Sequence, residues 1–205
     1  MPTTLLATMI ARAGNANARV MRALHQVGAV LFVTVLTIIA AQVSIPLPFT
    51  PVPLTFQPMV VLVGAAALGA RLGAASQLTY LALGAIGIPV FAASPILPQG
   101  VARFFGPTGG YLMAYPMAAF VAGWLAERRF DRRYATSVVA MACGLAFVFA
   151  GGVSWLALYV QPASGWSGAL AAGFYPFVVK DVVKLLVAAG AMPALWAVVR
   201  PLEDQ

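Results

Sequence analysis

Most of this chain consists of long runs without a charged residue. Four of them occupy Ala23–Ala70, Leu72–Ala102, Phe104–Ala126 and Tyr134–Val179. An apolar run of about 20 residues is enough to cross roughly 30 Å of hydrocarbon as a helix. Soluble domains carry about 25% charged residues, whereas this chain has 8%. The sequence therefore predicts an all-α integral membrane protein.

The rest of the composition argues against other classes. A transmembrane barrel is built from alternating segments of about 10 residues, a pattern that we do not find. The net charge of +7 comes from short flanks between the apolar runs, not from a stripe that could follow nucleic acid, so no nucleic-acid partner is expected. Cys143 is the only cysteine and His25 the only histidine, which argues against a disulfide framework or a metal cluster.

Proline-rich and charged segments divide the apolar runs into helices. The four prolines of Ile45–Pro53 lack the amide donor and the free φ angle that a helix interior needs, and Glu127–Arg133 forms a charged turn. Six membrane-spanning helices are expected, at about residues 26–44, 57–70, 72–88, 110–126, 135–160 and 169–199. Residues 1–24 are expected to form a cytoplasmic tail and residues 25–205 the membrane domain.

The arginines predict the orientation, because basic residues concentrate in cytoplasmic loops. With the N-terminus inside, Arg103 is the only arginine in an outer loop. The others are then cytoplasmic: Arg12, Arg19, Arg22, Arg71, Arg128, Arg129, Arg132, Arg133 and Arg200. Both termini are therefore expected in the cytoplasm.

Small residues recur at every fourth position of the fourth expected helix: Gly110, Ala114, Ala118 and Ala122. Such a stripe lets another helix approach closely. Packing within the chain is the more common use of this pattern, and a contact between subunits is the alternative.

Three ionisable residues interrupt the apolar sequence of the last helix: Lys180, Asp181 and Lys184. An ionisable side chain inside a span costs at least about 2.5–3.5 kcal/mol on insertion scales and usually faces a cavity or a partner. Asp181 and Lys184 are three residues apart, so they share a helix face and can pair. One interpretation is a purely structural ion pair. The other is a binding site for a ligand with one carboxylate, since Lys180, Lys184 and Arg103 outnumber the single acid.

The stretch RFFGPTGGY, Arg103–Tyr111, leads into the fourth expected helix. Thr108 is a candidate N-cap, and the free N–H groups of a helix start favour an anion. The stretch lacks the Gly-Lys-Ser/Thr ending of a phosphate loop, so this chain is not expected to bind ATP.

Uncharged polar residues also lie in apolar surroundings. Gln77 and Tyr80 are three residues apart and can share a helix face, and Thr50 lies in the first outer loop. Each is a candidate ligand contact, although a helix–helix hydrogen bond is the more common role of such a residue. Outer aromatic residues could line a pocket or form an interfacial belt: Phe49, Phe56, Phe91, Phe104, Phe105, Tyr111, Tyr159 and Trp166.

Four segments together resemble the BioY family. They are IPLPFTPVPLTFQ, GAIGIPVFA, GPTGGYLMAYPMAAFVAGWLAER and FVVKDVVK, in that order, and the resemblance extends over roughly residues 28–198. BioY proteins are the biotin-specific S components of energy-coupling-factor (ECF) vitamin transporters. The resemblance implies six helices that bind biotin from outside, in a bacterial or archaeal cytoplasmic membrane. It also implies partnership with a transmembrane coupling protein and two ATPase subunits, which would hydrolyse any ATP.

The resemblance also indicates where biotin would bind. The Asp-x-x-Lys pattern falls on Asp181 and Lys184, the glycine-rich helix start on Gly106–Tyr111, and a lid-like loop on Pro46–Pro53. With the residues singled out above, the candidate biotin contacts are Asp181, Lys184, Arg103, Tyr80, Gln77, Thr50 and Tyr111. Lys180 departs from the family, where we expect a small residue.

Other functions are alternatives to biotin transport. An S component for another anionic vitamin or small carboxylate would fit the charges as well, whereas cationic thiamine fits poorly. An intramembrane enzyme would need an acid–base pair, which cannot be assembled from His25, Cys143 and Asp181. We therefore expect a transport protein with no bound cofactor.

Overall fold

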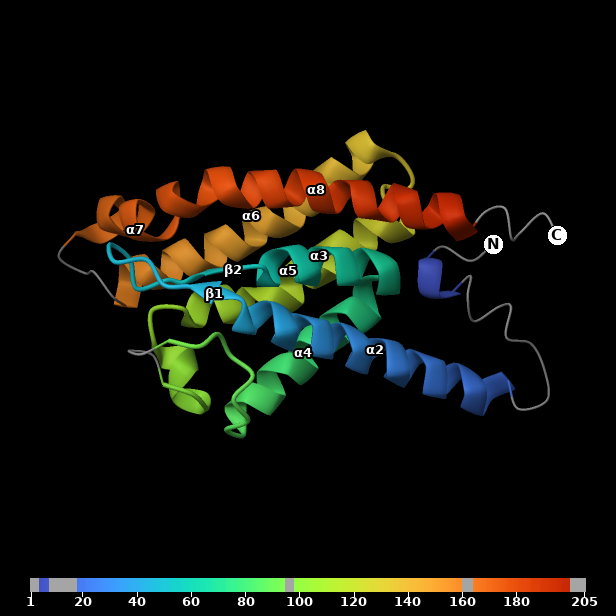
Figure 1. Ribbon diagram of the computed structural model, residues 1–205, viewed down its shortest axis with the longest axis horizontal. Coiled ribbons are helices and arrows are strands. Elements are labelled where there is room, and N and C mark those ends of the chain that lie inside the picture. The colour runs from blue at the N-terminus through green and yellow to red at the C-terminus, as the bar shows by residue number, and fades with distance from the viewer. Residues whose placement is uncertain (1–3, 8–17, 95–97, 160–163, 200–205) are drawn as a thin grey trace.

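The chain folds into an elongated bundle of helices with a small β-hairpin at one end (Figure 1). A computed structural model describes residues 4–7, 18–94, 98–159 and 164–199. The helices are α2 (Ala18–Gln42), α3 (Gln57–Leu68), α4 (Ala70–Ala85), α5 (Gly109–Glu127), α6 (Tyr134–Tyr159), α7 (Gly165–Gly173) and α8 (Tyr175–Val199). A 3₁₀ helix, η1, covers Val101–Phe105. The strands β1 (Ser44–Ile45) and β2 (Leu54–Thr55) pair antiparallel.

Most of the predicted helices are present, with shifted boundaries. Three helices in the described residues are long and apolar enough to cross a membrane, over Val20–Gln42, Tyr134–Leu158 and Tyr175–Val198, and the shorter apolar helix α3 covers Gln57–Leu68. The helix expected over residues 26–44 corresponds to α2, which starts at Ala18, inside the segment expected to be a tail. The all-α prediction needs one addition. The residues on either side of the proline-rich loop pair as the two short strands of a β-hairpin.

The small-residue stripe of α5 packs against α6. A methyl group added to Gly110 would run into Trp155 and the backbone of Gly151, and one added to Gly151 would run into Ala114. Farther along α5, Ala122 lies beside Gly144. The stripe therefore brings two helices of the same chain close together, as the first of the two interpretations predicted.

The sixth predicted helix is broken into α7 and α8 at Phe174. In an unbroken helix the amide of residue 176 would bond to the carbonyl of Ala172, but Pro176 has no amide hydrogen. The amide of Phe177 bonds instead to the carbonyl of Phe174, over 3.0 Å. The prediction of one continuous helix over residues 169–199 was wrong because it passed over Pro176.

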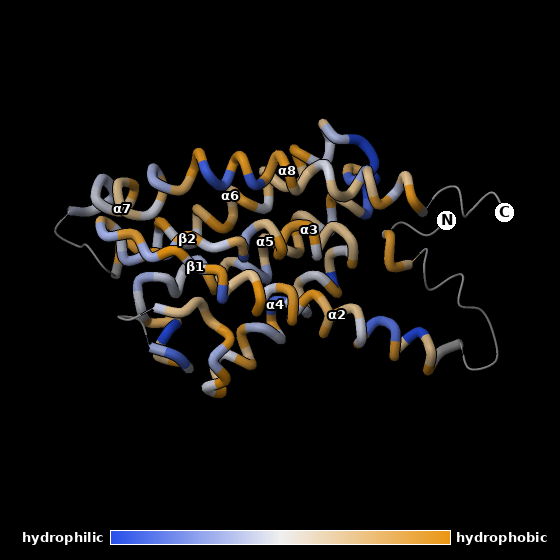
Figure 2. Tube along the Cα trace, in the orientation of Figure 1, coloured by the Kyte–Doolittle hydropathy of each residue, from blue (hydrophilic) through white to orange (hydrophobic). Residues whose placement is uncertain are grey.

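The two ends of the bundle differ in charge. The hairpin, η1 and α7 lie at the left-hand end in Figure 1, and the start of α2, the α3–α4 turn, the α5–α6 turn and the end of α8 lie at the right-hand end. The described arginines of the right-hand elements are Arg22, Arg71, Arg128, Arg129, Arg132 and Arg133, whereas Arg103 belongs to η1. Figure 2 shows the hydrophilic α5–α6 turn at the right and the apolar helices between the ends.

A buried polar contact fixes the right-hand end of α8. The Trp196 indole donates to Oδ2 of Asp131 in the α5–α6 turn over 2.5 Å, and the Arg132 guanidinium lies 3.4 Å from the centre of the Trp196 ring. Asp131 is only 1% exposed. Burial raises the pKa of the Asp131 carboxyl, although the Trp196 hydrogen bond and the Arg132 charge counteract the shift.

Candidate ligand-binding site

A cavity lies at the hairpin end of the bundle. Its wall combines the end of the hairpin and the start of α3 with η1 and parts of α5, α6 and α8. Apolar side chains make up much of this wall, and the polar and charged members include Gln57, Arg103, Thr108, Tyr111, Tyr115 and Asp181. An apolar pocket with a few convergent polar groups is the usual form of a small-molecule site.

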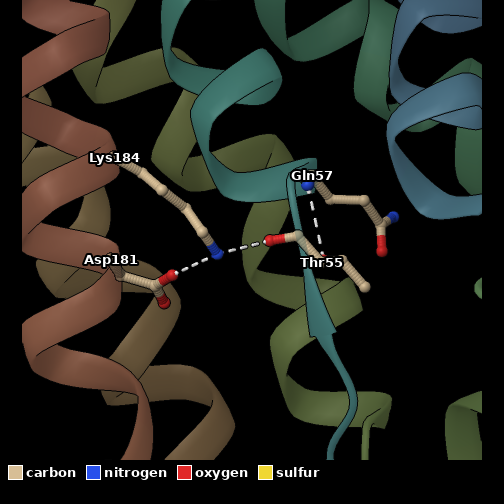
Figure 3. A network of polar contacts seen from close by, with 4 residues as sticks. All are labelled: Thr55, Gln57, Asp181 and Lys184. Carbon is tan, nitrogen blue, oxygen red and sulfur yellow. Dashed lines mark hydrogen bonds and ion pairs between the residues drawn. The ribbon is translucent and has the colours of Figure 1, made fainter. Parts of the chain in front are cut away.

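Asp181 and Lys184 form the predicted ion pair. The Lys184 ammonium lies 3.0 Å from Oδ1 of Asp181 and also donates to the carbonyl of Thr55, at the end of β2, over 2.7 Å. Figure 3 shows Lys184 reaching from α8 to this carbonyl while Asp181 stays beside its own helix. Asp181 lines both this cavity and a smaller neighbouring one, whereas Lys184 lines only the smaller one. The ammonium therefore joins α8 to the root of the hairpin.

Lys180 is not part of the cavity wall. Its side chain is exposed on the outside of α8, while Asp181 beside it is 8% exposed. Adjacent positions on a helix point about 100° apart, so the exposed position of Lys180 follows from the buried position of Asp181.

Arg103 lies almost completely buried in another part of the wall, with 1% of its surface exposed. Its guanidinium donates to the carbonyl of Ala92 over 2.8 Å and to that of Pro98 over 3.4 Å. These bonds hold the chain before η1 against the bundle. Nε of Arg103 has no hydrogen-bond partner within the described residues. Burial lowers the pKa of the Arg103 guanidinium, yet arginine remains charged in proteins.

Thr108 does not act as the N-cap that its sequence position suggested. It directly precedes α5, but its φ and ψ of −91° and −2° are helical and its side chain makes no capping bond. An N-cap residue normally has extended backbone angles, so that its side-chain oxygen can reach the N2 or N3 amide. The Thr108 hydroxyl is instead buried in the cavity wall, where no described residue forms a hydrogen bond with it.

Two tyrosines of α5 complete the polar part of the wall. Tyr111 and Tyr115 are four residues apart, so they lie on the same helix face. The Tyr111 hydroxyl donates to the carbonyl of Gly173 over 2.7 Å. Gly173 is the last residue of α7, next to Ala172, at the break before α8. Sequence analysis missed Tyr115, although its spacing from Tyr111 could have indicated it.

Tyr80 lies behind the wall and not in it. Gln57, which does line the cavity, donates from Nε2 to the Tyr80 hydroxyl over 2.8 Å, and this hydroxyl donates to the carbonyl of Val90 over 3.4 Å. The Tyr80 ring packs edge-on against Phe91. Tyr80 thus holds Gln57 in place, and Gln57 was not among the candidate biotin contacts predicted from the sequence.

Gln77 and Thr50 are placed elsewhere. Gln77 lies between α4 and α2, where Nε2 donates to the hydroxyls of Thr37 and Ser76 over 3.4 and 3.1 Å. This is the helix–helix hydrogen bonding left open as its alternative role. Thr50 lies in the connection between β1 and β2 and donates to the carbonyl of Ala172 over 2.6 Å. Thr50 therefore ties the hairpin to α7 and does not line the cavity that holds Arg103 and Asp181.

Opposite charges lie in different parts of the cavity wall. Arg103 reaches the cavity wall from η1 and Asp181 from α8. No ion pair joins these two residues in the described ranges. The same ranges hold no group of three or more His, Cys, Asp or Glu side chains that could bind a metal. The cavity suits a small molecule with an anionic end and an end that donates hydrogen bonds.

The fold and the cavity define a helical membrane protein that takes up a small molecule at one end of its bundle. The chain belongs to the BioY family, whose sequence profile matches residues 11–201.

Individual relatives agree with this assignment. The probable biotin transporter BioY of Pyrococcus horikoshii is 40% identical over 163 residues, which cover 80% of this chain and 91% of the relative. The biotin transporter BioY of Thermotoga maritima is 40% identical over 156 residues, covering 76% and 86%. The crystal structure of the S-component for biotin from an ECF-type ABC transporter superposes with a TM-score of 0.75 at 25% identity. That match covers 90% of this chain and 95% of the other.

Proposed function

We propose that this chain binds biotin from outside the cell in the cavity between η1 and α8 and serves its uptake across the membrane. The observation that carries the proposal is a cavity with a buried guanidinium on one side and a buried carboxylate on the other, in a chain of the BioY family. Biotin matches this polarity, because it has a carboxylate at the end of an aliphatic chain and two N–H donors on its ureido ring. The chain is a transport protein and not an enzyme.

Charge complementarity gives the bound ligand a direction. The biotin carboxylate meets Arg103, whose guanidinium can form charge-assisted hydrogen bonds, and a ureido N–H donates to Asp181. Arg103 precedes α5 in the loop at the hairpin end, whereas Asp181 lies in the second turn of α8. The ring therefore enters first, and the carboxylate remains nearer the outside.

Lys184 acts on the ligand through Asp181. Its ammonium is already bonded to Asp181 and to the carbonyl of Thr55, and Lys184 does not line the cavity that holds Arg103 and Asp181. The bond to Asp181 orients its carboxylate, and the bond to Thr55 holds the end of β2 against α8. This arrangement supports Arg103, rather than Lys184, as the partner of the carboxylate.

The bundle crosses a bacterial or archaeal cytoplasmic membrane six times, with α2, α3, α4, α5, α6 and α8 surrounded by lipid and both termini inside. The clustering of the described arginines at one end supports this orientation. The crystal structure that this chain resembles is a component of an ECF-type ABC transporter. The partners are accordingly a transmembrane coupling protein and two ATPase subunits, which supply the ATP hydrolysis.

Equilibrium binding tests the proposed function. The purified chain in detergent should bind labelled biotin saturably at one site, and excess unlabelled biotin should displace it while excess thiamine should not. A folded preparation that shows no saturable biotin binding would contradict the proposal.

A further inference from the structure

Two buried polar atoms in the cavity wall lack hydrogen-bond partners among the residues that the structure describes. They are the hydroxyl oxygen of Thr108 and Nε of Arg103. Thr108 is 6% exposed and Arg103 is 1% exposed, so bulk water does not replace the missing partners. Folded proteins pair more than nine in ten of their buried polar groups, and two exceptions in one cavity indicate a ligand that completes them.

The local backbone holds both residues in place. The amide of Gly106 bonds to the carbonyl of Arg103 and the amide of Gly109 to that of Gly106, over 3.2 and 3.0 Å. A side chain at Gly109 would collide with the carbonyl of Phe104. The turn from η1 into α5 is therefore tight, and it places Arg103 and Thr108 in the wall of the same cavity. Because the Thr108 hydroxyl makes no capping bond, it is free to bind a ligand.

The chemistry of the two atoms indicates which ligand group they share. Nε of arginine can only donate a hydrogen bond, whereas a hydroxyl can donate or accept. A group that satisfies both must therefore present acceptors, and a carboxylate has two oxygens with about four acceptor positions. Asp181, which can only accept when ionised, lines the cavity from α8 and suits the donor end of the ligand.

From this arrangement we infer that Thr108 is a specificity-determining residue whose hydroxyl donates to the ligand carboxylate, beside Nε of Arg103. The inference rests on the proposed function. It gives the ligand carboxylate a hydrogen bond from the neutral Thr108 hydroxyl in addition to the bond from the charged Arg103 guanidinium. Thr108 thereby distinguishes ligands that end in a carboxylate from those that end in an apolar group.

The test compares Thr108→Val, which keeps the side-chain shape and removes the hydroxyl, with Thr108→Ser, which keeps the hydroxyl. Each purified variant is titrated with biotin and with an analogue whose carboxyl group is replaced by a methyl group. Thr108→Val should weaken biotin binding roughly 10- to 100-fold, as expected for a hydrogen bond to a charged group. It should change binding of the analogue by less than about threefold, and Thr108→Ser should retain most of the biotin affinity.

Thr55→Val is the matched control. Thr55 also lines the cavity, but its hydroxyl already accepts a bond from the amide of Gln57 over 3.4 Å, so its loss should affect biotin less than Thr108→Val does. Thermal unfolding in detergent shows whether Thr108→Val disturbs the fold. If it does, Thr108→Ala serves as a second variant without the hydroxyl.

The inference is overturned if Thr108→Val and Thr108→Ala bind biotin as the wild type does, or if they weaken biotin and the methyl analogue equally. Those outcomes leave the proposed function intact, because the wild type would still bind biotin. A wild type that binds no biotin overturns both.

Discussion

The hydroxyl of Thr50 donates to the carbonyl of Ala172 over 2.6 Å and so joins the β1–β2 hairpin to the end of α7. That carbonyl is available because Pro176 lacks the amide hydrogen that would otherwise occupy it. The Gly173 carbonyl beside it accepts the hydroxyl of Tyr111 from the cavity wall. The break between α7 and α8 thus offers two acceptors, one to the hairpin and one to the cavity.

This relationship predicts that Thr50 slows the release of biotin. Thr50→Val keeps the shape of the side chain and removes one hydrogen bond, worth about 0.5–1.5 kcal/mol. We expect biotin to dissociate roughly 2- to 10-fold faster, with a smaller change in the association rate. A chase of labelled biotin with unlabelled biotin measures the dissociation rate. Ser44→Ala is the control, since it removes an exposed bond from the same hairpin to Ala93; an equal effect of the two variants would contradict the prediction.

Pro176→Ala should act on the same contact. Alanine restores the amide that can bond to Ala172 in a continuous helix, so it competes with the Thr50 hydroxyl and should also speed biotin dissociation. Residues that share one interaction give non-additive effects. The double variant Thr50→Val/Pro176→Ala should therefore release biotin only about as fast as the faster single variant, and fully additive effects would show that the two residues act independently.

The sequence predicted the positions of the helices well because uncharged runs and proline clusters have strong local causes. It also predicted the pairing of Asp181 with Lys184, since three-residue spacing on a helix brings side chains together. It did not predict which residues of other helices would pack against these side chains. Helical periodicity places Gln77 and Tyr80 on one face of α4 but does not say that α2 covers Gln77 or that Gln57 covers Tyr80. Thr108 matched an N-cap pattern, and only the backbone angles show that its hydroxyl is unused.

The buried Asp131 predicts a pH-dependent stability. Burial raises its pKa in the folded state above the value of 3.8 for a free carboxyl. The folded state therefore keeps the proton to a higher pH than the unfolded state does. The free energy of unfolding should then fall as the pH rises from the unfolded pKa through the folded pKa, and level off above it.

Asp131→Asn removes this titration but keeps an oxygen that can accept the Trp196 indole hydrogen. The melting temperature of the variant relative to the wild type should rise between about pH 4 and about pH 7. Thermal unfolding of both proteins in detergent at the two pH values measures this difference in melting temperature. A difference that stays constant with pH would mean that Asp131 does not titrate in this range.

The orientation can be tested with two cysteines in a Cys143→Ala background. Ser164, just before α7, and Ala135, in the first turn of α6, are both exposed and lie at opposite ends of the bundle. In intact cells, an impermeant maleimide should label Ser164→Cys. It should label Ala135→Cys only after the membrane is opened. The reverse pattern would contradict cytoplasmic termini.

The most direct test of the account compares biotin with biotin amide, which is uncharged at its end, in three proteins. Loss of a hydrogen bond to a charged group costs about 1.5–3 kcal/mol, so the wild type should prefer biotin by roughly one to two decades in Kd. Arg103→Gln should lose most of this preference. Lys184→Met should weaken both ligands by a similar factor and keep the preference, because Lys184 holds Asp181 and the hairpin root rather than the carboxylate. Loss of the preference in Lys184→Met, with the preference retained in Arg103→Gln, would contradict the account.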